Sequence, residues 1–390
     1  MLRSPFRNVS AAGLALLMLG AAVNVASASD VTGHVYVNDN TKGENTIAAF
    51  DRHSDGSLTP IPGSPFAAGG QGTGTIVGSQ GALQVSSDGR YLLAVDAGSN
   101  EISVLRIRPD GTLARVQGSP VDSGGFEPIS IAAHDHLVYV ANEGNKATGT
   151  GSNYTGFTFN AGGHLTALPG STIPLPSTAN PGDILFNPTG TNLIGVEVGT
   201  TDPNTFRIDS FTVGEDGRLI AAAGSPYAAQ AAGPFGSEFS PADPSRLYVS
   251  NAHGGMNNGS VSAFHVSPNG TVTSIAASPY ADGQTAPCWV EITHDGAHLF
   301  AVNTGSTSIS SYRIQSDGSL SYVTTTTFKS GNGIRPFDAR LDPSGADLYV
   351  VDAALNAVSA FAVDGGSLIE LAGSPFALPV GATPFGIVSI

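Results

Sequence analysis

Charged side chains are scarce in this 390-residue chain, yet five of them stand at fixed distances after a proline. Two aspartates follow a proline by two residues, and two glutamates and one arginine follow one by four: Asp183, Asp338, Glu238, Glu291 and Arg340. If the prolines open equivalent strands, alternate residues point to the same side, so these five would face one common space. Carboxyls gathered there could bind a divalent cation or, with separated pKa values, act as general acid and base. The simpler alternative is a ring of polar groups in contact with ordered water.

Two further carboxyls and one aromatic ring add to these candidates. Glu143 and Glu197 stand at the ends of the apolar runs VYVAN and LIGVE, which predicts that both lie at strand ends. Such a pair suits proton transfer or sugar binding, although simple solvation of strand ends also explains it. Trp289, beside Cys288, could stack against a sugar ring, whereas the alternative is a tryptophan of the core.

Other patterns disfavour several kinds of chemistry. His134-Asp135-His136, and His294 with His298, have the spacing of metal ligands, but both sets fall in predicted turns away from the longest loops. The glycine-rich run 69–74 precedes no helix, so it is not a phosphate cradle, and no G-x-S-x-G nucleophile motif is present. We therefore expect no cofactor, and we leave open a divalent cation among the five proline-linked side chains.

These residues belong to a unit of about fifty residues that recurs along the chain, as in repeat architectures. Its clearest copy, Arg335–Phe376, predicts four short strands, Phe337–Leu341, Asp347–Val351, Ala357–Val363 and Ser367–Leu371. The second strand ends in an acidic or amide residue in seven copies: Asp39, Asp96, Asn142, Glu197, Asn251, Asn303 and Asp352. A turn dipeptide such as Asp-Gly follows each third strand, and Ser-Pro follows the fourth strand in five copies. The fold class is therefore all-β, a seven-bladed β-propeller.

The first copy lacks its opening strand, and the missing piece stands at the other end of the chain, at Pro384–Ile390. We expect this segment to complete blade 1 and so to leave no open sheet edge. Topology also sorts the loops. Loops between blades and between second and third strands share one face, the long-loop face, and the Asp-Gly-type turns share the other, the DG-turn face.

The amino-terminal segment predicts that the propeller is exported from the cytoplasm. Arg3 and Arg7, an apolar run from Ala11 to Val25 and Ala26-Ser27-Ala28 predict a signal peptide over residues 1–28 and a mature domain over 29–390. We expect a secreted or periplasmic monomer without membrane insertion after cleavage. The single cysteine allows no disulfide within the chain. A formal net charge of −15 disfavours nucleic acid as a partner.

The repeat units resemble the seven-bladed lactonase family, which includes bacterial 6-phosphogluconolactonases and fungal carboxymuconate lactonising enzymes. The units that carry this resemblance include SSDGRYLLAVDAGSNEISVLRIRPDGTLARVQGSP and LDPSGADLYVVDAALNAVSAFAVDGGSL, and it spans residues 31–390. The family's Asn-Glu matches Asn142-Glu143. Its Arg-His falls on Ile129-Ser130, its blade-two histidine falls near Gly81, and its late arginine corresponds loosely to Arg335.

Two functions follow. In the first, a secreted hydrolase acts on a small sugar-type lactone or a carbohydrate acid at the long-loop mouth of the channel. Glu143 would be the acid or base, with Glu197 nearby, and Arg335 or Arg340 would hold the substrate carboxylate. In the second, a non-catalytic propeller binds a ligand or an extracellular protein through that face. Convergence of Glu143, Glu197, Asp183 and an arginine on one pocket would favour the enzyme, and scattered positions would count against it.

Overall fold

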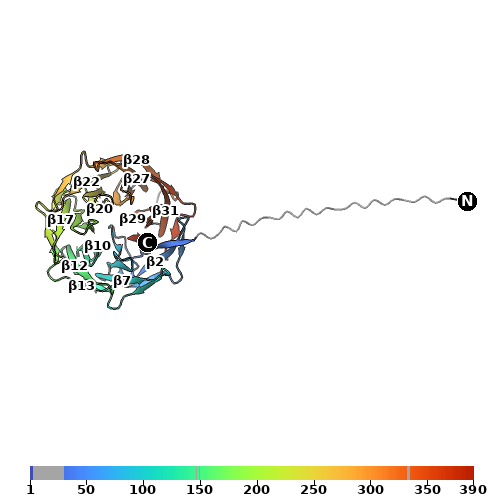
Figure 1. The fold of residues 1–390 in the computed structure, drawn as a ribbon, viewed down its shortest axis with the longest axis horizontal. Helices are drawn as coiled ribbons and strands as arrows, with labels where there is room; N and C mark the ends of the chain where they lie inside the picture. The colour runs from blue at the N-terminus through green and yellow to red at the C-terminus, as the bar shows by residue number, and fades with distance from the viewer. Residues whose placement is uncertain (3–29, 146, 149, 332–333) are drawn as a thin grey trace.

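The computed structural model describes residues 1–2, 30–145, 147–148, 150–331 and 334–390. These residues form seven antiparallel sheets arranged as a ring, as Figure 1 shows. The predicted signal peptide lies outside the described residues except for its first two positions. Within the described ranges no helix is long and apolar enough to cross a membrane.

Each blade is a meander of four strands, numbered outward from the channel. The innermost strands are β34 (Ile387–Ser389), β5 (Leu83–Val85), β10 (Pro128–His134), β15 (Pro181–Phe186), β20 (Pro234–Phe239), β25 (Pro287–Ile292) and β29 (Pro336–Leu341), for blades 1 to 7 in order. The second strands are β1 (Val31–Asn38), β6 (Tyr91–Asp96), β11 (Leu137–Asn142), β16 (Asn192–Glu197), β21 (Arg246–Asn251), β26 (His298–Asn303) and β30 (Asp347–Asp352). Five prolines thus open inner strands, as the sequence predicts.

The outer half of each blade is more polar. The third strands are β2 (Gly43–His53), β7 (Glu101–Ile107), β12 (Asn153–Phe159), β17 (Arg207–Val213), β22 (Ser260–Val266), β27 (Ser308–Ile314) and β31 (Ala357–Asp364). The fourth strands are β3 (Leu58–Pro60), β8 (Leu113–Arg115), β13 (Leu165–Ala167), β18 (Leu219–Ala221), β23 (Val272–Ser274), β28 (Leu320–Thr327) and β32 (Ser367–Glu370). A 3₁₀ turn, η1 (Pro203–Thr205), precedes β17.

A serine after the fourth strand, followed by proline in five blades and by Thr172 in blade 3, precedes a fifth, short strand that returns to the third. These strands are β4 (Phe66–Gly72), β9 (Val121–Asp122), β14 (Ile173–Pro174), β19 (Tyr227–Ala228), β24 (Tyr280–Ala281) and β33 (Phe376–Ala377). The hydroxyl of this serine accepts a hydrogen bond from the third strand, for example from the Val104 amide to Ser119 Oγ at 2.7 Å. Blade 6, where the Ser-Pro signal is lost, has four strands and a longer β28 in the described chain.

The ring closes as the sequence predicts, because β34 pairs with β1 and completes blade 1. Two contacts between blades 7 and 1 reinforce the seam. Arg52 Nη1 lies 3.1 Å from Asp342 Oδ2, with both side chains buried. The Tyr349 hydroxyl donates to the Gly56 carbonyl at 3.0 Å. Equivalent tyrosines of blades 1, 3 and 5, namely Tyr36, Tyr139 and Tyr248, bond the DG turn of the next blade in the same way.

The tyrosine contact at the seam predicts a measurable loss of stability. We expect Tyr349→Phe to lower the free energy of unfolding by about 1 kcal/mol, because the buried Gly56 carbonyl loses its partner. Tyr322→Phe is the matched control, since the Tyr322 ring is largely exposed and its hydroxyl contacts only Thr325 at the surface. Denaturant unfolding of both variants tests this, and equal effects would contradict a role in closure.

Candidate functional site

The structure gathers the five proline-linked side chains around the channel, on inner strands of blades 4 to 7. Asp183 is fully buried and hydrogen-bonded at both oxygens. Its Oδ1 accepts from the Ser130 hydroxyl at 3.1 Å, and its Oδ2 accepts from the Ser237 amide at 2.9 Å and hydroxyl at 2.7 Å. Blade 4 is thereby tied through one carboxyl to blades 3 and 5.

Arg340 forms an ion pair with Glu291 in the same cluster. Its Nη1 donates to Glu291 Oε2 at 3.0 Å, and the Leu341 amide donates to Glu291 Oε1 at 2.8 Å. Two other carboxyl oxygens, Glu238 Oε2 and Asp338 Oδ2, are buried and have no hydrogen-bond partner in the described structure. The cluster therefore holds one ion pair and two carboxyls with unused hydrogen-bonding capacity.

Burial separates the acid strengths of these groups. It raises the pKa of Asp183 to about 7 and the pKa of Asp338 to about 6, although Arg340 opposes the second shift. Burial and the neighbouring Glu291 raise the pKa of Glu238 well above its usual range. Burial alone would lower the pKa of Arg340, but the surrounding carboxyls, Glu291 first, outweigh it and raise that pKa. Glu238 is thus a much weaker acid than an exposed glutamate, and Asp183 is partly ionised near neutral pH.

A cavity of about 270 Å³ gives access to this cluster. Asp183, Ser237, Glu238 and Arg340 line it, together with Gln80 and Gln84. Its outer wall includes His134, the last residue of β10, and Asn187 and Pro188, which lie in the turn between β15 and β16. Because the turns between first and second strands share a face with the DG turns, the cavity opens on the DG-turn face.

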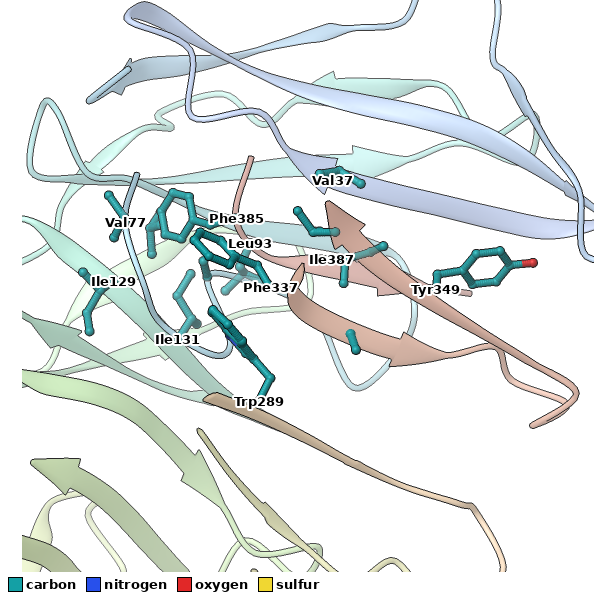
Figure 2. Close-up of a cluster of buried hydrophobic side chains, with 14 of the residues drawn as sticks. Val37, Val77, Leu93, Ile129, Ile131, Trp289, Phe337, Tyr349, Phe385 and Ile387 are labelled. Atoms are coloured by element: carbon teal, nitrogen blue, oxygen red, sulfur yellow. The ribbon is translucent and has the colours of Figure 1, made fainter. Parts of the chain in front are cut away.

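The opposite end of the channel is filled by apolar side chains. Figure 2 shows Val77, Ile129, Phe385, Phe337 and Trp289 packed together, and all five are buried. The Trp289 ring lies 4.7 Å from Phe337 and 5.4 Å from Phe235, centroid to centroid, and its Nε1 donates to the Ser79 carbonyl. This packing leaves no face of the Trp289 ring free for a ligand. The position of Trp289 is therefore that of a core residue, the alternative considered above to stacking against a sugar ring.

The catalytic set expected at the long-loop mouth is not assembled. Glu143 lines a separate cavity of about 420 Å³ between blades 3 and 4, with Asn145, Ser152 and Asn180. Arg335 lies over the Phe337 ring at 5.7 Å, and its amide contacts Asp352. Neither residue lines the channel cavity. The convergence of Glu143, Glu197, Asp183 and an arginine that would favour an enzyme with this catalytic set is therefore not observed.

Glu197 is buried inside the blade 3–blade 4 contact. It interacts with the buried carboxyl of Asp209, whose Oδ2 accepts from the Tyr154 hydroxyl at 2.9 Å. Other blades pair an amide with a serine here, as Asn251 Nδ2 does with Ser262 Oγ at 2.9 Å. Burial, and then the charge of Asp209, raises the pKa of Glu197 to about 8, and burial raises that of Asp209 to about 6. The pair therefore retains a proton at neutral pH.

This carboxyl pair predicts a pH-dependent stability. The folded protein holds a proton on Glu197 that the unfolded chain releases near pH 4.5, so the stabilisation is complete below that pH and declines as pH rises towards 8. Across this window, we expect the free energy of unfolding of wild type to fall by up to about 1.4 kcal/mol per pH unit relative to that of Glu197→Gln, because the glutamine amide stays neutral. Glu215→Gln, an exposed carboxyl of the same blade, is the control. Parallel melting-temperature profiles for wild type and Glu197→Gln would contradict the shared proton.

Four polar residues of the site are absent from the sequence-based prediction: Gln80, Gln84, Ser130 and Ser237. A signal for the first two exists, because blade 2 lacks an opening proline and has the run Gly-Ser-Gln-Gly at 78–81 instead. Serines at inner-strand positions carry no comparable signal. Within the described residues, no group of three or more His, Cys, Asp or Glu side chains is arranged to hold a metal ion.

Several solved structures share this fold. A candidate 6-phosphogluconolactonase from Bacteroides fragilis is 18% identical with a TM-score of 0.72, over 93% of this chain and 98% of that one. One from Bacteroides uniformis is also 18% identical, with a TM-score of 0.73 over 93% and 100%. The periplasmic gluconolactonase of Pseudomonas aeruginosa is 18% identical, with a TM-score of 0.69 over 92% and 99%. No curated protein sequence matches.

The seven sheets form a closed ring around a channel. The protein is therefore a seven-bladed β-propeller, with a cluster of buried carboxyls in that channel. The family described as lactonase, 7-bladed beta-propeller, matches residues 43–148 and 196–384, and the chain belongs to this family. The unmatched residues 149–195 include β12 to β15, the region that carries Asp183.

Proposed function

We propose that this protein hydrolyses a small lactone in the channel cavity. The observation that carries the proposal is the convergence of Asp183, Glu238 and Arg340 on one cavity, in a chain of the lactonase family. The three groups supply a base, an acid and a cation, which are the parts that ester hydrolysis requires.

The roles follow from the charge states. Asp183, partly ionised near neutral pH, accepts a proton from the water that attacks the lactone carbonyl carbon. The Arg340 guanidinium stabilises the oxyanion that forms. Glu238, whose pKa burial raises, gives a proton to the ring oxygen as its bond to carbon breaks. The product is the open hydroxy acid, and the proton on Asp183 returns to Glu238 through solvent.

This assignment predicts a pH–rate profile. Hydrolysis, corrected for the uncatalysed reaction, should rise as Asp183 ionises around pH 7 and fall at higher pH as Glu238 loses its proton. Asp183→Asn should lower kcat by about a hundredfold or more and remove the rising limb. Added chelator should leave the rate unchanged. An unaltered rising limb in Asp183→Asn would contradict its role as the base.

A binding function without catalysis is the second candidate. Asp183 already accepts three hydrogen bonds. A carboxyl with its hydrogen-bonding capacity used in this way is as consistent with a structural role as with the role of a base. The cavity beside Glu143 on the long-loop face would then hold the ligand or contact an extracellular protein. A folded sample that hydrolyses no lactone favours this candidate. Under both proposals, the protein is exported to the periplasm or the medium and acts there as a monomer.

A further inference from the structure

The segment that leads into blade 2 crosses the channel instead of running along its rim. The Ser79 hydroxyl donates to the Ile129 carbonyl of blade 3 at 2.6 Å, and the Gln80 amide donates to the Gly182 carbonyl of blade 4 at 3.1 Å. The Trp289 ring of blade 6 donates to the Ser79 carbonyl at 2.7 Å. Residues 75–82, called the plug below, are thus bonded to inner strands around the ring.

Gln80 lies at the inner tip of the plug, and its side chain is fixed at both ends. Its Nε2 donates to the Ser237 carbonyl of blade 5 at 2.9 Å, and its Oε1 accepts from the Val290 amide of blade 6 at 3.1 Å. The side chain lies so close to blade 5 that a Cβ atom at Gly236 would come within 2.2 Å of Gln80 Oε1. Packing and two hydrogen bonds therefore hold this amide in one place.

The position of the amide separates two regions of the channel. Gln80 lines the cavity that contains Asp183, Glu238 and Arg340. It also adjoins the apolar cluster, because its Oε1 accepts a hydrogen bond from the Val290 amide next to Trp289, and the Trp289 ring packs on Phe337. Without the Gln80 side chain, the cavity would extend from the carboxyl cluster towards the backbone of Trp289.

We propose that Gln80 ends the channel cavity and determines how long a substrate the site accepts, and that the plug leaves the DG-turn face as the route of entry. The specificity part of this inference rests on the lactone hydrolysis proposed above. The closure of the cavity by Gln80, called the seal below, does not rest on hydrolysis, because it is a property of the folded channel.

The seal is tested by fluorescence of Trp289, the single tryptophan of the chain. We expect weak acrylamide quenching in wild type and a quenching constant about twofold or more higher in Gln80→Ala, because a small amide can then reach the ring. Gln315→Ala, in the DG turn of blade 6, is the matched control and should quench like wild type. If Gln80→Ala does not fold, Gln80→Asn shortens the same amide by one methylene. Unchanged quenching in a folded variant would overturn the seal.

The specificity is tested with two lactones that differ only by a short alkyl chain. For Gln80→Ala, the ratio of kcat/KM for the longer over the shorter substrate should rise about tenfold or more relative to wild type, the scale of one or two methylenes in a pocket. An unchanged ratio in an active variant would overturn the role of Gln80 and leave the hydrolase proposal intact. If wild type hydrolyses no lactone, the hydrolase proposal and the specificity role fail together, and quenching alone decides the seal.

Discussion

Phe385→Ala should lower the free energy of unfolding by about 3–5 kcal/mol, the range for truncating a fully buried phenylalanine. Phe385 has no exposed surface and lies in the cluster of Figure 2, at the point where the C-terminal segment enters the ring. Its amide also bonds the Asn38 carbonyl of β1, so the side chain anchors the strand pairing that joins the chain ends.

Val380→Ala is the control for this prediction, because Val380 lies five residues earlier and is fully exposed. Its effect should stay within about 0.5 kcal/mol, as for most surface substitutions. A chain that ends at Thr383 should fail to fold cooperatively, since β1 would lose both a strand partner and three buried side chains. Equal stability of Phe385→Ala and Val380→Ala in denaturant titrations would contradict closure through the C-terminal strand.

Arg340→Met should be the most damaging single change in the channel. Removing one partner of a buried ion pair typically costs about 3–5 kcal/mol, because the remaining charge is left without compensation. Here Glu291 would remain buried with only the Leu341 amide as a donor, next to the carboxyls of Asp338 and Glu238. Lactone hydrolysis should fall as well, since the oxyanion would lose its cation.

A double variant separates stability from activity in this prediction. Arg340→Met with Glu291→Gln should recover most of the lost stability, because the stranded charge is gone, yet it should remain inactive. Arg313→Met, an exposed arginine on β27, should leave both unchanged. A double variant no more stable than Arg340→Met, in urea unfolding, would show that the ion pair is not what makes Arg340 important.

The sequence predicts the ring well because its signals are local and repeated. Gly56, Gly217 and Gly365 have positive φ in their turns, as Asp-Gly dipeptides after third strands require. Alternation after the opening prolines is enough to place Asp183 and Arg340 on the channel, since side chains on one strand alternate between its two faces. The missing strand of blade 1 identifies β34 by elimination.

The site is harder to predict, because alternation does not show which end of a channel is open. Glu143 and Glu197 both stand at second-strand ends, yet one lines a surface cavity and the other packs inside a blade contact. Gln80 reaches the channel through a loop that contacts other blades: its amide donates to the Gly182 carbonyl, and its side chain occupies space that a Cβ at Gly236 would need. That path is a tertiary feature: the run Gly-Ser-Gln-Gly at 78–81 marks blade 2 as different from the other blades, but it does not specify where the loop goes.

The most direct test of the channel site compares two carboxyls on opposite faces, by lactone hydrolysis with Glu238→Gln and Glu143→Gln. A panel of phosphorylated and unphosphorylated lactones, corrected for uncatalysed opening, gives kcat for each folded variant. The channel site predicts that Glu238→Gln lowers kcat by about a hundredfold or more, the scale of a lost general acid, while Glu143→Gln stays close to wild type. Loss of activity in Glu143→Gln with Glu238→Gln unaffected would contradict it and place the reaction on the long-loop face.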